Sequence, residues 1–340
     1  MSLPRFSRRM NPLFFIVILT SFFCFSCGKT TAPSTARAEP AASVKPSPEN
    51  QRKSSAETNR LPNPYGPPVQ VGVLEGSAVK ESSGIVASRV EPNLYWTHND
   101  SGDGPFIYAF DGRGKRRGVW RVAGANAEDW EDIAAGPGPE QNRSFLYIGD
   151  TGDNDEGRKQ IIVYRIPEPV TTAEDAASTK REPRLTETAE AIRLRYPDGH
   201  HDAETLLVHP QTGDLYIITK TPLVNPGVYK AAAPLNTSEV TTLVRIGYLS
   251  VPNILGGTLT GGDISPDGRR VALCDYMQAY EIELPGNSQV SFDAIWKQPI
   301  AIIPLGRREQ GEAICYRLDG KALLATSEGK RAPLIEVVRK

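Results

Sequence analysis

The sequence predicts an all-β fold, a β-propeller of five four-stranded blades, with a sixth blade left open by the long interval between Asp132 and Asp202. Two observations predict it. First, a unit of two apolar strands joined by a turn, with acidic side chains around it, recurs along the chain. A repeat of roughly 50 to 70 residues that is built from strands is the pattern of a propeller. Second, almost no segment has the apolar period of a long amphipathic helix.

The two inner strands of each blade have the clearest signals. First strands are expected at 83–86, 129–133, 202–208, 262–264 and 311–314. Second strands are expected at 94–100, 146–150, 215–220, 271–275 and 322–328. The segments between them at Pro210–Asp214, Pro266–Gly268 and Leu318–Gly320 have the composition of hairpin turns.

The outer strands follow in each repeat. Third strands are expected at 107–110, 163–166, 228–230, 279–282 and 334–337, and fourth strands at 118–122, 191–196, 243–246 and 300–303. The last repeat lacks a fourth strand, whereas 69–74 is a strand signal that precedes the first repeat. Pairing this strand with the last blade would close the ring and remove an open edge. The stretch 167–188 is expected to be a long outer loop.

The first 68 residues predict export rather than folding. Residues 1–26 have a basic start and an apolar run too short to span a bilayer, which indicates a lipoprotein-type signal peptide. Cys27 is then the expected lipidation site, and an ordinary signal peptide cut further on is the alternative. Residues 27–68 are rich in Pro, Ala and Ser and are expected to form a disordered tether, with the propeller domain at 69–340. We therefore expect a bacterial cell-envelope protein at the outer membrane, in the periplasm or at the cell surface.

Composition narrows the partners. The formal net charge is -1, which gives no sign of a nucleic-acid partner, and we expect a monomer. Cys274 and Cys315 are predicted within the folded part, where an oxidising compartment would permit a disulfide and two buried free thiols are the alternative. The four tryptophans are expected in the blade cores rather than on a sugar-binding platform.

Strand direction predicts where unusual side chains gather. Because blade strands are antiparallel, the loop before each first strand lies at the same end as the loop between second and third strands. The carboxylates expected to converge there and to bind calcium (Ca2+) are Glu131, Asp132, Asp150, Asp153, Asp202, Glu204, Asp263 and Glu312. The alternative is structural: such acids can accept backbone N–H groups from the neighbouring blade, and the loop after Asp150 can form Asx turns.

Four further residues at this end are candidates for catalysis. His98 and His201 would move a proton, and Lys220 and Arg308 would hold an anionic substrate, while the metal would polarise a phosphoryl or carbonyl oxygen. The alternative for both histidines is a place among polar surface residues, which is where such histidines more often lie. Zinc is not expected because His and Cys do not cluster at ligand spacing. The sequence has no P-loop, nucleophile elbow or dinucleotide-binding glycine motif.

Several segments carry a family resemblance, namely Trp96–Gly102, Asp129–Ala134, Tyr147–Asn154 and Asp202–Glu204. Over residues 70–340 the chain resembles secreted and lipid-anchored bacterial β-propellers. More distantly, its first-strand acids are similar to those of β-propeller phytases and of calcium-dependent lactonase and esterase propellers. That resemblance implies calcium at the mouth of the central channel and hydrolysis of phosphate esters, lactones or esters there. The alternative is a non-catalytic envelope propeller that binds a protein or glycan.

Overall fold

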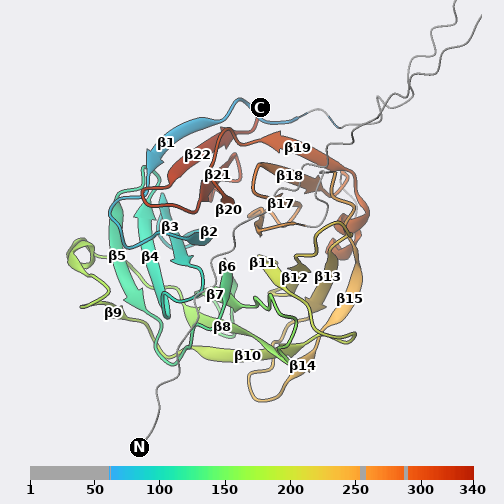
Figure 1. Cartoon of the computed structure of the whole chain (residues 1–340), viewed down its shortest axis with the longest axis horizontal. Helices are drawn as coiled ribbons and strands as arrows, with labels where there is room; N and C mark the ends of the chain where they lie inside the picture. Colours follow the sequence, from blue (N-terminus) through green and yellow to red (C-terminus); the bar gives the residue numbers. More distant parts are fainter. Residues whose placement is uncertain (1–60, 62, 253–257, 287–289) are drawn as a thin grey trace, which may run out of the picture. The chain divides into compact units, whose positions relative to one another are not determined.

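The computed structural model of the protein describes residues 61, 63–252, 258–286 and 290–340, all within one compact unit, Ser55–Lys340. Five β-sheets are arranged in a ring around a central axis (Figure 1). The predicted signal peptide, Cys27 and most of the predicted tether lie outside the described residues. Within the described part, no helix is long and apolar enough to cross a membrane.

Each sheet is a blade whose first strand lines the central channel. Blade 1 contains β2 (Ser82–Ala87), β3 (Leu94–Asn99), β4 (Phe106–Asp111) and β5 (Arg116–Arg121). Blade 2 contains β6 (Trp130–Pro137), β7 (Ser144–Asp150), β8 (Ile161–Pro167) and β10 (Glu190–Arg195). Blade 3 contains β11 (Ala203–Val208), β12 (Leu215–Thr219), β13 (Gly227–Ala231) and β15 (Val244–Tyr248).

The remaining two blades complete the ring. Blade 4 contains β16 (Gly261–Ile264), β17 (Arg270–Cys274), β18 (Gln278–Glu283) and β19 (Ile300–Pro304). Blade 5 contains β20 (Gly311–Tyr316), β21 (Ala322–Ser327), β22 (Pro333–Val338) and, as its outermost strand, β1 (Val69–Val73). Five blades are therefore confirmed, and the interval between Asp132 and Asp202 holds no sixth.

The N-terminal strand closes the ring, as the sequence predicts. β1 pairs antiparallel with β22, with Val69 opposite Glu336. The propeller includes residues before the predicted boundary at residue 69, because Tyr65 is buried and bridges Arg339. Its hydroxyl donates to Glu281 over 2.5 Å. A single aromatic residue among Pro, Asn and Gly has no strand periodicity, so the pattern alone could not include it.

The connections at the rim are more ordered than a long loop. The predicted loop 167–188 contains the 3-10 helix η1 (Ala173–Ala177) and the short strand β9 (Arg184–Leu185), which pairs parallel with β5 of blade 1. The short strand β14 (Thr241–Thr242) likewise pairs with β10 of blade 2. A second 3-10 helix, η2 (Phe292–Lys297), joins β18 to β19. Chain from one blade thus covers the outer edge of the preceding blade.

The hydrophobic core is divided into five clusters, one between each pair of adjacent blades. All four tryptophans are buried in blade cores, as expected. Cys274 and Cys315 are buried free thiols. Cys274 faces the cluster between blades 4 and 5, whereas Cys315 faces the cluster between blades 5 and 1. The sheet of blade 5 therefore separates the two thiols, which excludes a disulfide between them.

Two carboxylates inside the channel join first strands of different blades. Asp132 on β6 accepts the amide of Leu206 on β11 over 3.0 Å and that of Gly262 on β16 over 3.3 Å. Asp263 on β16 accepts the amide of Tyr316 on β20 over 2.9 Å. Both side chains are buried, so each bond satisfies an amide that water does not reach.

The charge of Asp263 should make stability depend on pH. Burial raises its pKa to about 6, partly offset by Arg89, whose guanidinium lies 3.9 Å away. The native state therefore holds this proton at a pH where the unfolded chain has lost it, so stability falls as pH rises from about 4 through about 6. The free energy of unfolding of the wild type minus that of Asp263→Asn should fall by about 2 to 3 kcal/mol across this range. Urea unfolding at each pH measures it.

Asp319→Asn, a change in an exposed hairpin turn, is the control for this experiment. Its difference from the wild type should stay the same at each pH. A difference for Asp263→Asn that is equally constant would contradict the assignment of the titration to this buried carboxyl.

Candidate cation site at the channel mouth

The loops at one end of the channel bring the predicted site residues together. The loops that precede the first strands and those that join second to third strands lie at this end, as the antiparallel pairing of every blade requires. We call this end the mouth. The turns between first and second strands lie at the opposite end.

Three glutamates from three blades project at the mouth from β-bulges. The pairing of β6 with β7 shifts register at Glu131, that of β11 with β12 at Glu204, and that of β20 with β21 at Glu312. A bulge inserts an unpaired residue, re-aims its side chain and is over-represented next to functional sites. All three side chains are at least nine-tenths buried.

Two aspartates complete this group. Asp100 follows β3 of blade 1 and Asp129 precedes β6 of blade 2. One carboxylate oxygen from each of Asp100, Asp129 and Glu131 lies within 4.8 Å of the others. The sequence analysis places both aspartates at the ends of predicted strands but does not include them among the predicted ligands. We call Asp100, Asp129, Glu131, Glu204 and Glu312 the mouth cluster.

A glycine leaves the space that two of these carboxylates occupy. A β-carbon on Gly152, in the loop from β7 to β8, would lie 2.2 Å from Oε1 of Glu131 and 2.4 Å from Oδ2 of Asp129. Both atoms are at the ends of side chains, which could move away. The bare backbone at Gly152 is therefore what permits the two carboxylates to lie there.

Lys220 neutralises only part of this charge. Its ammonium pairs with Oε1 of Glu204 and lies 5.3 Å from the centre of the Tyr276 ring. The other carboxylate oxygen of Glu204, Oε2, is buried and has no hydrogen-bond partner among the described residues. A buried carboxylate oxygen without a partner is unfavourable, so this atom marks the cluster as incomplete.

The electrostatics of the cluster favour protonation. Burial, followed by the charge of Glu204, raises the pKa of Glu131 well above its ordinary value. Burial also raises the pKa of Glu204, with Lys220 opposing the rise and Glu312 adding to it. The pKa of Glu312 rises to about 8 and that of Asp129 to about 6, in each case mainly through burial. Like charges and desolvation together destabilise the ionised cluster unless a cation compensates.

Asp202 and Glu328 lie at the edge of the cluster. Asp202 contributes to the raised pKa of Glu131 and accepts the amide of Asp153 over 2.8 Å. The side-chain amide of Gln310 donates to Glu312 and to Glu328, over 2.8 Å in each case. Gln310 therefore links the cluster to the loop that joins β21 to β22.

Four other predicted metal ligands have their oxygens committed to the fold. Asp132 and Asp263 accept channel amides as described above. Asp150 pairs with Arg158 over 2.8 Å and accepts the amides of residues 128 and 129. Asp153 accepts the amides of residues 157 and 158. These contacts match the structural alternative, so we leave these four carboxylates out of the cation site.

The predicted catalytic residues are dispersed. His98 is fully buried against Trp130, and burial lowers its pKa. Arg308 is buried, with its guanidinium donating to the carbonyls of Thr326 and Asp275. His201 lies in the loop before β11, where its Nε2 is 3.2 Å from Asp198 and 3.1 Å from the hydroxyl of Tyr229. Of the four, Lys220 alone contacts the mouth cluster directly.

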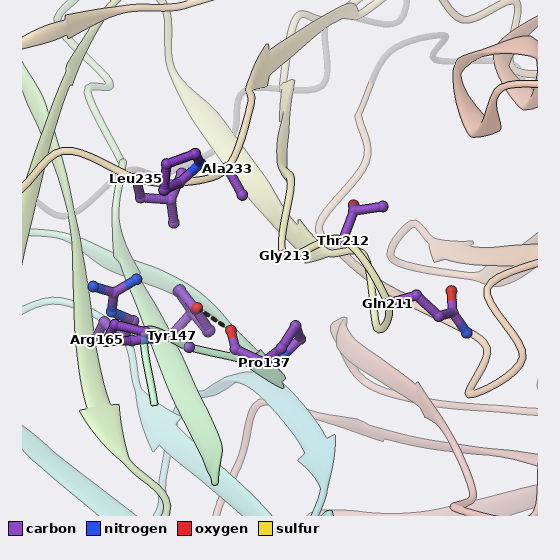
Figure 2. Close-up of a pocket in the computed structure, with 11 residues that line it drawn as sticks. Pro137, Tyr147, Arg165, Gln211, Thr212, Gly213, Ala233 and Leu235 are labelled. Atoms are coloured by element: carbon purple, nitrogen blue, oxygen red, sulfur yellow. Dashed lines mark hydrogen bonds between the residues drawn. The ribbon is translucent and has the colours of Figure 1, made fainter. Parts of the chain in front are cut away.

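A pocket of about 490 Å³ at the opposite end offers less chemistry (Figure 2). It is lined by turn residues such as Pro137 and Thr212 together with Tyr147 and Arg165. The hydroxyl of Tyr147 donates to the carbonyl of Pro137, and Arg165 pairs with Glu190. Because these polar groups are already satisfied, the mouth remains the stronger candidate site.

Fold and site together define a five-bladed β-propeller with an acidic channel mouth. No family model and no curated protein matches the chain. Among solved structures it is similar to Raptor from Chaetomium thermophilum, with 12% sequence identity and a TM-score of 0.36. The match covers 80% of this chain and 20% of that one, so the chain spans about a fifth of that protein. Similarity at this level carries no argument about function.

Gly152→Ala should impair cation binding at the mouth without unfolding the protein. The added methyl group would displace the carboxylates of Glu131 and Asp129, which can swing aside at small cost to the fold. We expect Ca2+ affinity, measured by isothermal titration, to fall about tenfold or more, because ligand position sets the affinity of such sites.

Gly157→Ala is a matched control in the same loop, because a β-carbon there would meet nothing within 4 Å. It should bind Ca2+ like the wild type. Equal affinity in both variants and the wild type would show that Glu131 and Asp129 are not ligands.

Proposed function

We propose that the chain is a calcium-binding β-propeller of the bacterial cell envelope, and that the cation at its channel mouth serves hydrolysis of phosphate esters or of lactones and esters. One observation carries the proposal: carboxylate oxygens of Asp100, Asp129 and Glu131 lie within 4.8 Å of one another at the mouth, beside the charges of Glu204 and Glu312. A buried oxygen of Glu204 also has no hydrogen-bond partner among the described residues.

The donor set fits a hard cation. Glu131, Glu204 and Glu312 with Asp100 and Asp129 offer only carboxylate oxygens, which Ca2+ accepts in flexible arrangements of six to eight ligands. Oε2 of Glu204 has no hydrogen-bond partner among the described residues, whereas both oxygens of a purely structural acid would be satisfied by the fold. This oxygen is therefore available to a cation. The cluster is also open in part, since Asp100 and Asp129 are only half-buried, which leaves a face for substrate and water.

The chain's own residues would supply binding and proton transfer. When bound, the cation would polarise a phosphoryl or carbonyl oxygen and lower the pKa of water. Lys220, beside Glu204, would hold the negative charge of the substrate. His201 would move the proton, because Asp198 and Tyr229 orient its imidazole in the loop that leads to Asp202. The buried His98 and Arg308 are left out of this mechanism.

The proposed location rests on the sequence. The signal-type segment 1–26 and Cys27 support a lipid anchor, and a tether before Tyr65 would let the propeller extend from a membrane surface. A propeller anchored in this way would act on small anionic substrates in the envelope.

Calcium should stabilise the full-length protein against heat. An ion at 100 times its dissociation constant stabilises the native state by about 2.7 kcal/mol, which is a rise of roughly 5 °C or more for a domain of this size. Magnesium should give less, because it dehydrates reluctantly and needs octahedral geometry. Glu131→Gln should lose the calcium shift, while in chelator its melting temperature should equal or exceed that of the wild type, because a neutral amide replaces a buried carboxyl whose ionised form is unfavourable.

Glu140→Gln, an exposed change at the opposite end, is the control and should keep the full calcium shift. An identical shift in wild type and Glu131→Gln would place calcium elsewhere.

The hydrolytic part is tested by turnover of a generic phosphomonoester, ester and lactone with calcium present. Activity that survives both Glu131→Gln and Glu204→Gln would refute it.

A different observation favours a second candidate, a non-catalytic module that binds a protein or glycan. Apolar side chains are exposed in two mouth loops: Leu223 is 77% exposed, Val224 53% and Met277 60%. Leu223 also has φ of 65°, an unfavourable backbone conformation for a leucine. Exposed apolar groups at one face are a feature of docking surfaces.

This candidate predicts that the double variant Leu223→Ser with Val224→Ser loses a partner while its melting temperature stays unchanged. Capture from envelope extract, with a glycan array in parallel, measures it against the wild type. A partner bound equally by both proteins, or none bound by the wild type, would contradict the hypothesis of a non-catalytic binding module.

A further inference from the structure

A second concave site lies beside the mouth, on the outer side of blade 5. This pocket has a volume of about 420 Å³ and lies between the loop from β19 to β20 and the loop from β21 to β22. We call it the blade-5 pocket. Its charged lining consists of four cations and two acids, which are Arg307, Arg308, Lys330, Arg331, Glu309 and Glu328. The pocket is thus basic, although the adjacent mouth is acidic.

One of these cations is held rigidly. The guanidinium of Arg308 donates from Nη1 to the carbonyl of Thr326 and from Nη2 to that of Asp275, each over 3.1 Å. Gly311 leaves the space it needs, because a β-carbon there would lie 2.2 Å from Cζ of Arg308. The Nε atom of Arg308 is buried and has no acceptor among the described residues. A fixed positive charge with an unused donor is suited to an anion.

The other three cations are exposed. Arg307, Lys330 and Arg331 form no ion pair with any described residue. Four cations against two acids give the pocket an excess of positive charge, which raises the local potential and attracts counter-ions. Together with Arg308 they surround the pocket from both of its loops.

The backbone at Arg331 supports a role for its side chain. Arg331 has φ of 57°, in the left-handed region, where a residue with a β-carbon is strained. The two other left-handed positions in these loops, at 306 and 329, carry glycine. A strained position that keeps a long basic side chain motivates a functional hypothesis for that side chain.

We propose that the blade-5 pocket binds a doubly charged oxyanion, the phosphate or sulfate group of a ligand whose remainder reaches the channel mouth. The excess of cations over acids favours a dianion over a carboxylate. Glu328 lines the pocket and Gln310 links it to Glu312 of the mouth cluster, so the two sites are adjacent. The link to catalysis rests on the proposed function, whereas the affinity for an oxyanion does not.

The test measures inorganic phosphate binding by the full-length protein in chelator, by isothermal titration at fixed salt. Arg331→Gly should keep or raise the melting temperature, because it relieves the strained backbone, and Arg307→Gln changes an exposed side chain. The two changes together should weaken phosphate binding about tenfold or more, since each removes a charged donor. Arg181→Gln, an exposed cation outside the pocket, is the matched control and should change affinity less than about twofold.

Sulfate should compete with phosphate, and acetate should compete more weakly. Phosphate that binds wild type and the Arg307/Arg331 variant equally, or does not bind the wild type, would overturn the proposal. Acetate that competes as well as phosphate would overturn the preference for a dianion. Phosphate binding that depends on Arg331 in a protein that fails to bind calcium would support the pocket and refute the proposed cation site separately.

Discussion

The narrowness of a channel lined by only five first strands is the constraint on which this structure depends. Asp132 on one strand reaches amides on two others, and a β-carbon on Gly84 or on Gly261 would lie 2.6 Å from the backbone of the next blade. The interior therefore has space only for small residues and for carboxylates that accept backbone N–H groups. Larger charged side chains on the first strands must lie at the mouth.

The bulges are what place the glutamates at the mouth. In β6, the unpaired residue Glu131 faces the mouth, while the next residue, Asp132, turns back into the channel and binds amides. β16 pairs without a shift and its strand begins with two glycines, so blade 4 adds no glutamate. The five-fold repeat is thereby broken. An unequal set of ligands around one side of the axis suits a single cation better than a symmetric ring of like charges.

The fold could be predicted because each blade repeats a strand pattern. The closing strand could be predicted because the strand signal before the first repeat had no place in any other blade. The end of the propeller that carries the candidate site could also be predicted, since the antiparallel order of the strands determines which loops lie at the same end. Which acid faces the mouth could not be predicted. Glu131 and Asp132 are adjacent, and the bulge that separates their roles depends on pairing with β7, which leaves no mark in the sequence. Likewise the burial of His98 depends on packing against Trp130 in the next blade.

The opposite charges of the mouth and the blade-5 pocket are hidden in a formal net charge of -1. Glu312 and Glu328, joined through Gln310, lie along the boundary between the two. In the proposed scheme, a cation held at Glu312 would reduce the repulsion that these acids exert on an oxyanion in the pocket. By linkage, the oxyanion would then strengthen cation binding by the same factor. Such reciprocal coupling would favour ligands that carry an oxyanion and a second oxygen donor over either group alone, which gives the adjacency of the two sites a chemical consequence.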